Sequence, residues 1–306
     1  MQVMNETNAR DANKMLVESP IQEVLQSERE TKQQDIVFYE KCDLENIGNP
    51  QFCTDYAFAI FEFLRASEKK FLIDPTMIYK QLDINEKMRA ILVDWLVDVH
   101  LKFKLLPDTL FLTVNIIDRY LEAVQVSRQE LQLIGVTAMF IAAKYEEIYS
   151  PETKDYAFIT DNAYTVAQIL ETEGKILTTL KFELTYSSQY RFLIRYARIK
   201  GIEEKLFMLA RYVIELALIE HRMQKYSPSQ IAASAIYLAC KIFRKEAWND
   251  EYESSLKYDE LTVKSGAKDL CHLLQTADRS ALQAVRKKFS HPKYLEISKI
   301  QLERCS

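Results

Sequence analysis

Few residues of this 306-residue chain are placed to carry out chemistry. Glu146 and Glu147 could supply a general acid and a general base, because two nearby carboxyl groups can share that work. They are adjacent in sequence, however, and neighbouring side chains on a helix point about 100° apart. The two carboxylates therefore cannot flank one substrate, and we interpret them as the solvated tip of a helix.

Metal and cofactor sites have no recognisable pattern either. Cys271 and His272 are neighbours and lack the spacing of zinc ligands. The sequence contains no GxSxG, Walker or GxGxxG pattern. The four histidines are scattered along the chain: His100, His221, His272 and His291. We therefore expect no catalytic residues, no metal and no cofactor, and a binding or regulatory role is favoured over an enzyme on a helical scaffold.

The composition is that of a soluble globular protein without a preference for nucleic acid. Hydrophobic residues make up 48% of the chain, charged residues make up 27%, and only 5 residues are glycine. So few glycines argue against phosphate-binding loops. The net charge of -4 argues against nucleic acid as the main partner, since proteins that bind a phosphate backbone are usually basic.

The five cysteines form no CxxC pair, so disulfides are not expected and an intracellular, reducing location is favoured. The first residues lack the basic-then-apolar order of a signal peptide. No segment approaches the roughly 18 consecutive apolar residues that a membrane span needs. We therefore expect no membrane association.

Hydrophobic periodicity predicts helices along most of the chain. The central one is Leu131–Glu147, which is apolar on every face and rich in small residues, as in a helix surrounded by other helices. Ser127 and Glu130 have the spacing of a capping box that would open it, and Thr165 and Gln168 have the same spacing. Further helices are predicted at Asp55–Lys70, Met88–Leu105, Thr109–Leu121, Thr165–Leu180, Ser188–Ile199, Leu206–Ile219, Ile231–Phe243, Tyr258–Leu274 and Ser280–Phe289.

The second half of the chain repeats the first. LIGVTAMFIAAKY (Leu133–Tyr145) is similar to QIAASAIYLACKI (Gln230–Ile242) at an offset of 97 residues, so that Lys144 matches Lys241. Because a second pair of segments recurs in the same order at nearly this offset, we predict two sequential units of about five helices each. A polar loop is predicted in the second unit, at Lys245–Ser255.

Several long motifs, taken in order, resemble one family. MRAILVDWLVDVHLKF (Met88–Phe103), LQLIGVTAMFIAAKYEEIYSPE (Leu131–Glu152) and FITDNAYT (Phe158–Thr165) resemble the cyclins, and are most similar to the B-type (G2/mitotic) group. The resemblance implies an all-α fold, with an N-terminal helix followed by two tandem five-helix cyclin boxes. We expect a polar, largely disordered segment at 1–48, the N-terminal helix and first box at 49–184, and the second box and C-terminal tail at 185–306.

The resemblance implies a regulatory, non-catalytic subunit that activates a cyclin-dependent serine/threonine kinase in G2/M control, in the nucleus and cytoplasm. Lys144 and Glu173 align with the family's Lys/Glu pair that grips the kinase near its αC helix. A Lys donates to carbonyls and a Glu accepts from amides, so the two can hold one backbone segment between them. The other implied kinase-binding positions are apolar, and self-packing is the competing interpretation for each: Tyr145, Phe182, Tyr56, Ile60 and Phe63.

The resemblance also implies a groove that recruits substrates or inhibitors with Arg-x-Leu-type docking motifs. Asp98 would meet the basic end of the docking peptide, and Gln132 would bond its backbone. An apolar helical face is more often core than binding site, but apolar residues cover most of this helix, which favours a second, partner-facing side. The apolar positions of the groove are Met88, Ile91, Leu92 and Trp95.

One feature departs from the mitotic members, and two alternatives stay open. The Arg-x-x-Leu spacing of a destruction box occurs only within predicted helical regions, at Arg89–Leu92, Arg128–Leu131 and Arg279–Leu282. A transcription-linked cyclin is the nearer alternative, and the B-type form of the first box disfavours it. A transcription factor built from cyclin-like repeats is the other, and it would predict a basic surface and a zinc ribbon.

Overall fold

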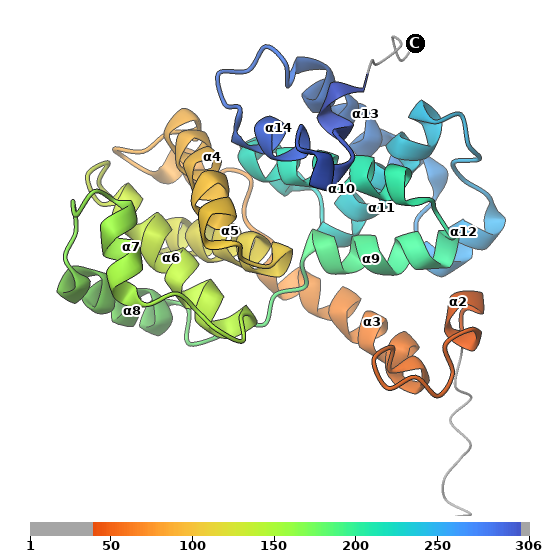
Figure 1. Cartoon of the computed structure of the whole chain (residues 1–306), viewed down its shortest axis with the longest axis horizontal. Helices are drawn as coiled ribbons and strands as arrows, with labels where there is room; N and C mark the ends of the chain where they lie inside the picture. The colour runs from red at the N-terminus through yellow and green to blue at the C-terminus, as the bar shows by residue number, and fades with distance from the viewer. Residues whose placement is uncertain (1–38, 301–306) are drawn as a thin grey trace, which may run out of the picture. The chain divides into compact units, whose positions relative to one another are not determined.

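The computed structural model describes residues 39–300, and this part of the chain is helical throughout. It contains thirteen α-helices, α2–α14, and five short 3-10 helices, η1–η5, and no strand occurs between residues 39 and 300 (Figure 1). The predicted all-α class is confirmed. Most of the segment predicted to be disordered, residues 1–48, lies outside the described residues, as do residues 301–306.

The first bundle is built around one buried helix, α6. Every residue of α6 from Ile134 to Ala143 is buried, as predicted for a helix surrounded by other helices. Gly135 permits the close approach of a neighbouring helix, because a Cβ at this position would lie 2.6 Å from Cδ1 of Leu92. The five helices of the first bundle are α4 (Glu86–Phe103), α5 (Pro107–Ala123), α6 (Leu131–Glu146), α7 (Thr153–Ile159) and α8 (Val166–Thr179).

The second bundle repeats the helix order of the first. The second, third and fourth helices of the two bundles begin 97 residues apart, which is the offset of the sequence repeat. Its central helix is α11, which is buried from Ile231 to Cys240. The prediction of two tandem five-helix units is therefore confirmed. The helices of the second bundle are α9 (Gln189–Lys200), α10 (Glu204–Ile219), α11 (Pro228–Ile242), α12 (Asp250–Leu256) and α13 (Glu260–Thr276).

Three local predictions need correction. The segment Lys245–Ser255 is not all loop, because α12 begins within it, with the Asn249 side chain accepting a bond from the Tyr252 amide. Helix α7 was not predicted, since seven residues are too few to establish a helical period. Ser127 does not cap α6. The Glu130 carboxylate accepts from the Ser127 hydroxyl at 2.7 Å within a turn, and the helix begins at Leu131, the residue after Glu130. The predicted cap at Thr165 is confirmed.

Two helices that precede the first bundle pack on the second. These are α2 (Lys41–Leu44) and α3 (Thr54–Glu68); the 3-10 helix η1 (Lys69–Phe71) follows α3, and its Phe71 ring lies under Arg119 of α5. Helix α2 lies within the segment predicted to be largely disordered, and Asp43 forms a buried ion pair with Arg195 of α9. The ring of Phe61 in α3 lies 6.3 Å from the ring of Phe192 in α9. The N-terminal helix is therefore held by the repeat that is more distant in sequence (Figure 1).

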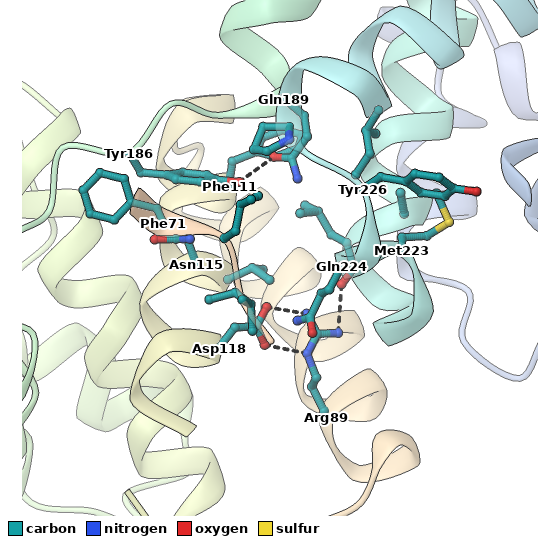
Figure 2. Close-up of a pocket in the computed structure, with 17 residues that line it drawn as sticks. Phe71, Arg89, Phe111, Asn115, Asp118, Tyr186, Gln189, Met223, Gln224 and Tyr226 are labelled. Atoms are coloured by element: carbon teal, nitrogen blue, oxygen red, sulfur yellow. Dashed lines mark hydrogen bonds and ion pairs between the residues drawn. The ribbon is translucent and has the colours of Figure 1, made fainter. Parts of the chain in front are cut away.

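A buried arginine joins the two bundles directly. Arg89 of α4 is 1% exposed and pairs with Asp118 of α5 through two hydrogen bonds of 2.6 and 2.7 Å. The same guanidinium donates to the carbonyl oxygens of Leu218 and Ile219 at the end of α10, at 3.0 and 3.2 Å. Figure 2 shows this pair at the edge of a cavity of about 60 Å³ between the bundles. Because ligand pockets are several times larger, we interpret the pair as a structural joint.

The remaining elements complete the packing between bundles. After α13, the chain returns to the first bundle, where the Ala284 amide donates to Asp94 of α4 at 2.9 Å. These elements are η2 (Met77–Lys80), η3 (His221–Lys225), α14 (Ala284–Phe289), η4 (Pro292–Tyr294) and η5 (Ile297–Lys299). Within residues 39–300, none of the helices is both long and apolar enough to span a membrane.

Candidate functional site

The structure brings the predicted charged pair together at the end of the central helix. Lys144 lies on the last turn of α6 and Glu173 lies in the middle of α8, and their side chains form an ion pair. The Lys144 side chain is 45% exposed, whereas that of Glu173 is only 12% exposed. The acid is thus sheltered by the bundle, and the ammonium group is presented to solvent.

A ring beneath Lys144 adds to its support. The Lys144 Nζ atom lies 4.2 Å from the centre of the Phe140 ring, one turn earlier on α6, which is within range of a cation–π interaction. An ammonium group has three donors, and a carboxylate has about four acceptor positions. The pair therefore keeps free donors and acceptors with which it could bind the backbone of another protein.

Two predicted apolar residues, Tyr145 and Phe182, also have exposed side chains. Tyr145 follows Lys144 and is 48% exposed, with its hydroxyl 2.7 Å from that of Thr185. Phe182 is 69% exposed and lies just after α8. Its backbone, like that of Lys181, has a positive φ, which residues other than glycine adopt at a cost of about 1–2 kcal/mol. We call Lys144, Tyr145, Glu173 and Phe182 the α6–α8 patch.

Two further apolar residues at this end of the molecule are exposed and were not predicted. Ile148 and Tyr149 follow Glu147, the residue after α6, and are 89% and 92% exposed. A shallow hollow begins beside them and is lined by Phe140, Lys144 and Pro151, among others. The usable signal was that two large apolar residues stand side by side in a short loop between Glu147 and Pro151, next to the exposed end of α6, since contiguous exposed apolar residues can mark a contact surface.

The predicted face of α3 is exposed as well. Tyr56, Ile60 and Phe63 recur at the spacing of one helical face, and all three are exposed. Phe61 points to the other side of α3 and packs against the core, as does Leu64 at the edge of this face. Self-packing therefore does not account for the first three residues, which we call the α3 outer face.

The six predicted groove residues divide into reachable and buried positions. Ile91 is 58% exposed, and Leu92 is only 6% exposed because it packs against Gly135 of α6. Leu92 therefore lies beneath the surface of the free chain, and its contact with a docked peptide stays a prediction. The other groove residues are partly or fully exposed: Met88, Trp95, Asp98 and Gln132.

The two adjacent glutamates are not a solvated helix tip. Glu147 accepts hydrogen bonds from the Leu106 amide, at 2.6 Å, and from the Thr109 hydroxyl, so it caps the start of α5. Glu146 pairs with Arg191 of α9 at 3.2 Å, and burial raises the pKa of its carboxyl group. The prediction of a solvated tip is wrong, because both carboxylates bind elements distant in sequence. Their separate partners agree with the argument against an acid/base pair.

The histidines form no metal site with the other candidate ligands of residues 39–300. No group of three or more His, Cys, Asp or Glu side chains within that range could hold a metal ion. His100 is a core residue whose Nε2 lies 2.9 Å from the Leu106 carbonyl, and burial lowers its pKa to about 4. His221 lies 2.7 Å from the Pro75 carbonyl.

Two family models match the chain in tandem. The model described as "Cyclin, N-terminal domain" matches residues 59–185, and the model described as "Cyclin, C-terminal domain" matches residues 188–303. The first match contains the α6–α8 patch and the groove residues. The second contains the second bundle from its first helix onward.

Curated relatives cover most of the chain. The G2/mitotic-specific cyclin-B of Dictyostelium discoideum is 40% identical over 85% of this chain and 60% of the relative. Cyclin-A1-1 of Arabidopsis thaliana is 44% identical over 83% of this chain and 57% of the relative. The G2/mitotic-specific cyclin-B of Marthasterias glacialis is 42% identical over 85% of this chain and 67% of the relative. The chain thus spans about three fifths of the length of these relatives.

Solved structures share the fold. An X-ray structure of a viral cyclin from herpesvirus saimiri matches with a TM-score of 0.63 and 21% identity, over 70% of this chain and 96% of the other. The crystal structure of the yeast RNA Pol II CTD kinase CTDK-1 complex matches with a TM-score of 0.55 and 16% identity, over 65% and 69%. At such identities the similarity concerns the fold alone.

Proposed function

Because this chain belongs to the cyclin family, we propose that it is a non-catalytic regulatory subunit that binds and activates a cyclin-dependent serine/threonine kinase. The observation that supports this most directly is the Lys144–Glu173 ion pair. The pair lies at the surface among exposed apolar side chains. In the second bundle the matching lysine, Lys241, forms no ion pair within residues 39–300, so the fold does not require the pair.

The kinase would be bound by a charged centre within an apolar surround. Lys144 and Glu173 would hold a segment of kinase backbone through their free donors and acceptors. Tyr145 and Phe182, with the α3 outer face, would supply the apolar area. Large apolar side chains that stay exposed in the free protein gain most from burial in a complex, at about 25 cal/mol for each Å².

Activation would follow from selective binding. A protein kinase needs the glutamate of its αC helix paired with a strand lysine, and its activation loop moved aside. A subunit that binds only the conformation with αC in place shifts the kinase population toward that state. A shift from 1% to 99% active requires a preference of about 5.5 kcal/mol. The role proposed for this chain is to supply that preference, while the kinase performs the phosphoryl transfer.

The exposed side of α4 would recruit substrates and inhibitors with Arg-x-Leu-type docking motifs. Ile91 and the partly buried Met88 and Trp95 offer the leucine an apolar surface. Asp98 is exposed one turn further along α4, where it can meet a basic residue of the peptide. Gln132 of α6 offers its side-chain amide to the backbone of the docking peptide.

We further propose a role at G2/M, with the protein in the nucleus and the cytoplasm. The names of two of the relatives, which are G2/mitotic-specific cyclins, support the phase. The location is the one that the family resemblance implies.

A reconstituted kinase assay tests this function. The purified chain is mixed with a monomeric cyclin-dependent kinase, and complex formation and histone phosphorylation are measured together. We expect a stable complex and a large increase in phosphorylation over the kinase alone. Absence of both a complex and activation, across the cyclin-dependent kinases of the source organism, would contradict the proposal.

A further inference from the structure

Glu68 is a buried acid at the last residue of α3. Glu68 is only 4% exposed. One carboxylate oxygen accepts a hydrogen bond from the Ser229 amide at 2.9 Å, and the other accepts from the Ser229 hydroxyl at 2.7 Å. Since Ser229 is the second residue of α11, α3 is bonded to the start of the central helix of the second bundle.

The start of α11 needs this carboxylate. The first amides of a helix have no partner within the helix. At α11 the first residue, Pro228, has no N–H, and the third, Gln230, donates to the Ser227 side chain. The Ser229 amide is the one that remains, and Glu68 accepts from it. The negative charge also lies at the favourable end of the α11 dipole.

A network of neighbouring side chains fixes the carboxylate in place. The Ser229 hydroxyl lies 2.6 Å from the Tyr258 hydroxyl, and the Arg65 guanidinium lies 5.3 Å from the centre of the Tyr258 ring. Arg65 also donates to the Tyr196 hydroxyl at 2.6 Å. Burial raises the pKa of the Glu68 carboxyl group, and its hydrogen bonds to Ser229 oppose that shift.

Arg65 lies on the side of α3 that faces away from its outer face, and Glu68 lies on the buried flank between the two sides. Arg65 and Glu68 follow Phe63 by two and five residues. At about 100° for each residue, their side chains point roughly 160° and 140° away from Phe63. Fixing one side of α3 against the second bundle therefore determines how Tyr56, Ile60 and Phe63 are presented.

We propose that Glu68 is a positioning residue for kinase binding: by capping α11 it holds α3 on the second bundle with the α3 outer face turned toward the kinase. The inference rests on the proposed function, since it assumes that the outer face binds the kinase. It gives the second bundle a part in kinase binding that needs no contact with the kinase.

The first test compares the affinity of variants for the kinase. Glu68→Ala should weaken binding by about tenfold, because it leaves the buried Ser229 amide without a partner. Glu68→Gln keeps an acceptor and should recover most of that loss. Glu62→Ala is the matched control on the same helix: its partner is Lys257 in an exposed pair, and its affinity should stay within about twofold of the wild type. Should Glu68→Ala fail to fold, Ser229→Ala removes one of the two bonds and should weaken binding by about threefold.

A double-mutant cycle separates positioning from general destabilisation. If Glu68 acts through the outer face, Phe63→Ala should cost much less affinity in the Glu68→Ala background than in the wild type. Additive losses, or unchanged affinity of Glu68→Ala, would overturn the inference.

Hydrogen exchange of the free chain keeps the inference distinct from the proposed function. In Glu68→Ala the amides of α3 and the Ser229 amide should exchange faster, while those of α5 and α6 stay protected. Unchanged exchange in α3 would refute the positioning role whether or not the wild type binds a kinase. If the wild type fails to bind any kinase, the proposed function fails, and faster exchange would still establish the cap.

Discussion

The two bundles share their core and differ at their ends. The central helices α6 and α11 are both lined with small apolar residues, and each has a lysine at its fourteenth residue, Lys144 and Lys241. In the first bundle, the eighth residue of the fifth helix is Glu173, which pairs with that lysine. In the second bundle, the eighth residue of the fifth helix is Ala267, which is 5% exposed.

This difference separates the features that recur with the fold from one that does not. Lys241 lies over the Tyr237 ring at 5.4 Å, much as Lys144 lies over Phe140, so the lysine and its ring recur with the fold. Lys241 also has an acid within electrostatic range, Glu260 of α13, but that carboxylate pairs with Lys264, and within residues 39–300 Lys241 forms no ion pair. The Lys144–Glu173 ion pair is thus the feature that distinguishes the first bundle.

The largest effect is expected at the joint between the bundles. Arg89 is the fourth residue of α4, whereas the fourth residue of α9 is Phe192, so only the first bundle places a charge at this position. Arg89→Ala should lower the free energy of unfolding by about 3–5 kcal/mol, because it leaves Asp118 buried and unpaired. Urea denaturation measures this change. Arg128→Ala removes an exposed pair with Asp83 and should cost less than about 1 kcal/mol, and equal costs would contradict the assignment of the joint.

Acid should weaken the first bundle through His100. The folded pKa of His100, about 4, lies below the value of 6.5 for an unperturbed histidine, because burial disfavours the charged form. The unfolded chain therefore takes up the proton first, and stability is lost as the pH falls from 6.5 toward 4. Through this group the wild type should lose about 2 kcal/mol of its free energy of unfolding between pH 7 and pH 5, and His100→Gln should not show that loss. Exposed His272 is the control, and an unchanged pH profile in His100→Gln would contradict the account.

A smaller effect is expected on the exposed side of α4. Trp95, the tenth residue of α4, is partly exposed, while the tenth residue of α9, Arg198, lies 4.8 Å from the Phe52 ring. Trp95→Ala should leave kinase binding unchanged and lower kcat/KM by about tenfold only for substrates with docking motifs, about 1.4 kcal/mol. Lys102→Ala, on the same helix, should change neither quantity. Loss of folding in Trp95→Ala would show instead that this residue belongs to the core.

The sequence predicted the parts of this fold that repeat. Helices α6 and α11 were recognisable because they are long, apolar and similar to each other. Helices α7 and α12 were missed because seven residues, about two turns, are too few for a helical period to be recognised. The capping box predicted at Ser127 was wrong, because Glu130 bonds Ser127 within a turn and α6 begins only after Glu130.

The sequence predicted the site less completely, because several of its side chains depend on partners far along the chain. The pairing of Lys144 with Glu173 followed from the family resemblance. The burial of Leu92 depends on Gly135, and the caps supplied by Glu68 and Glu147 depend on Ser229 and Leu106. Such contacts join residues between about 40 and 160 positions apart, which local patterns do not encode.

The affinity of charge-reversed variants for the kinase tests the central claim most directly. Lys144→Glu and Lys241→Glu change the same position of the two bundles and the same net charge. We predict that Lys144→Glu weakens kinase binding by at least about 30-fold, or 2 kcal/mol, whereas Lys241→Glu binds like the wild type. Equal affinities of the two variants, with both folded, would contradict the claim that the first bundle alone carries the kinase-binding pair.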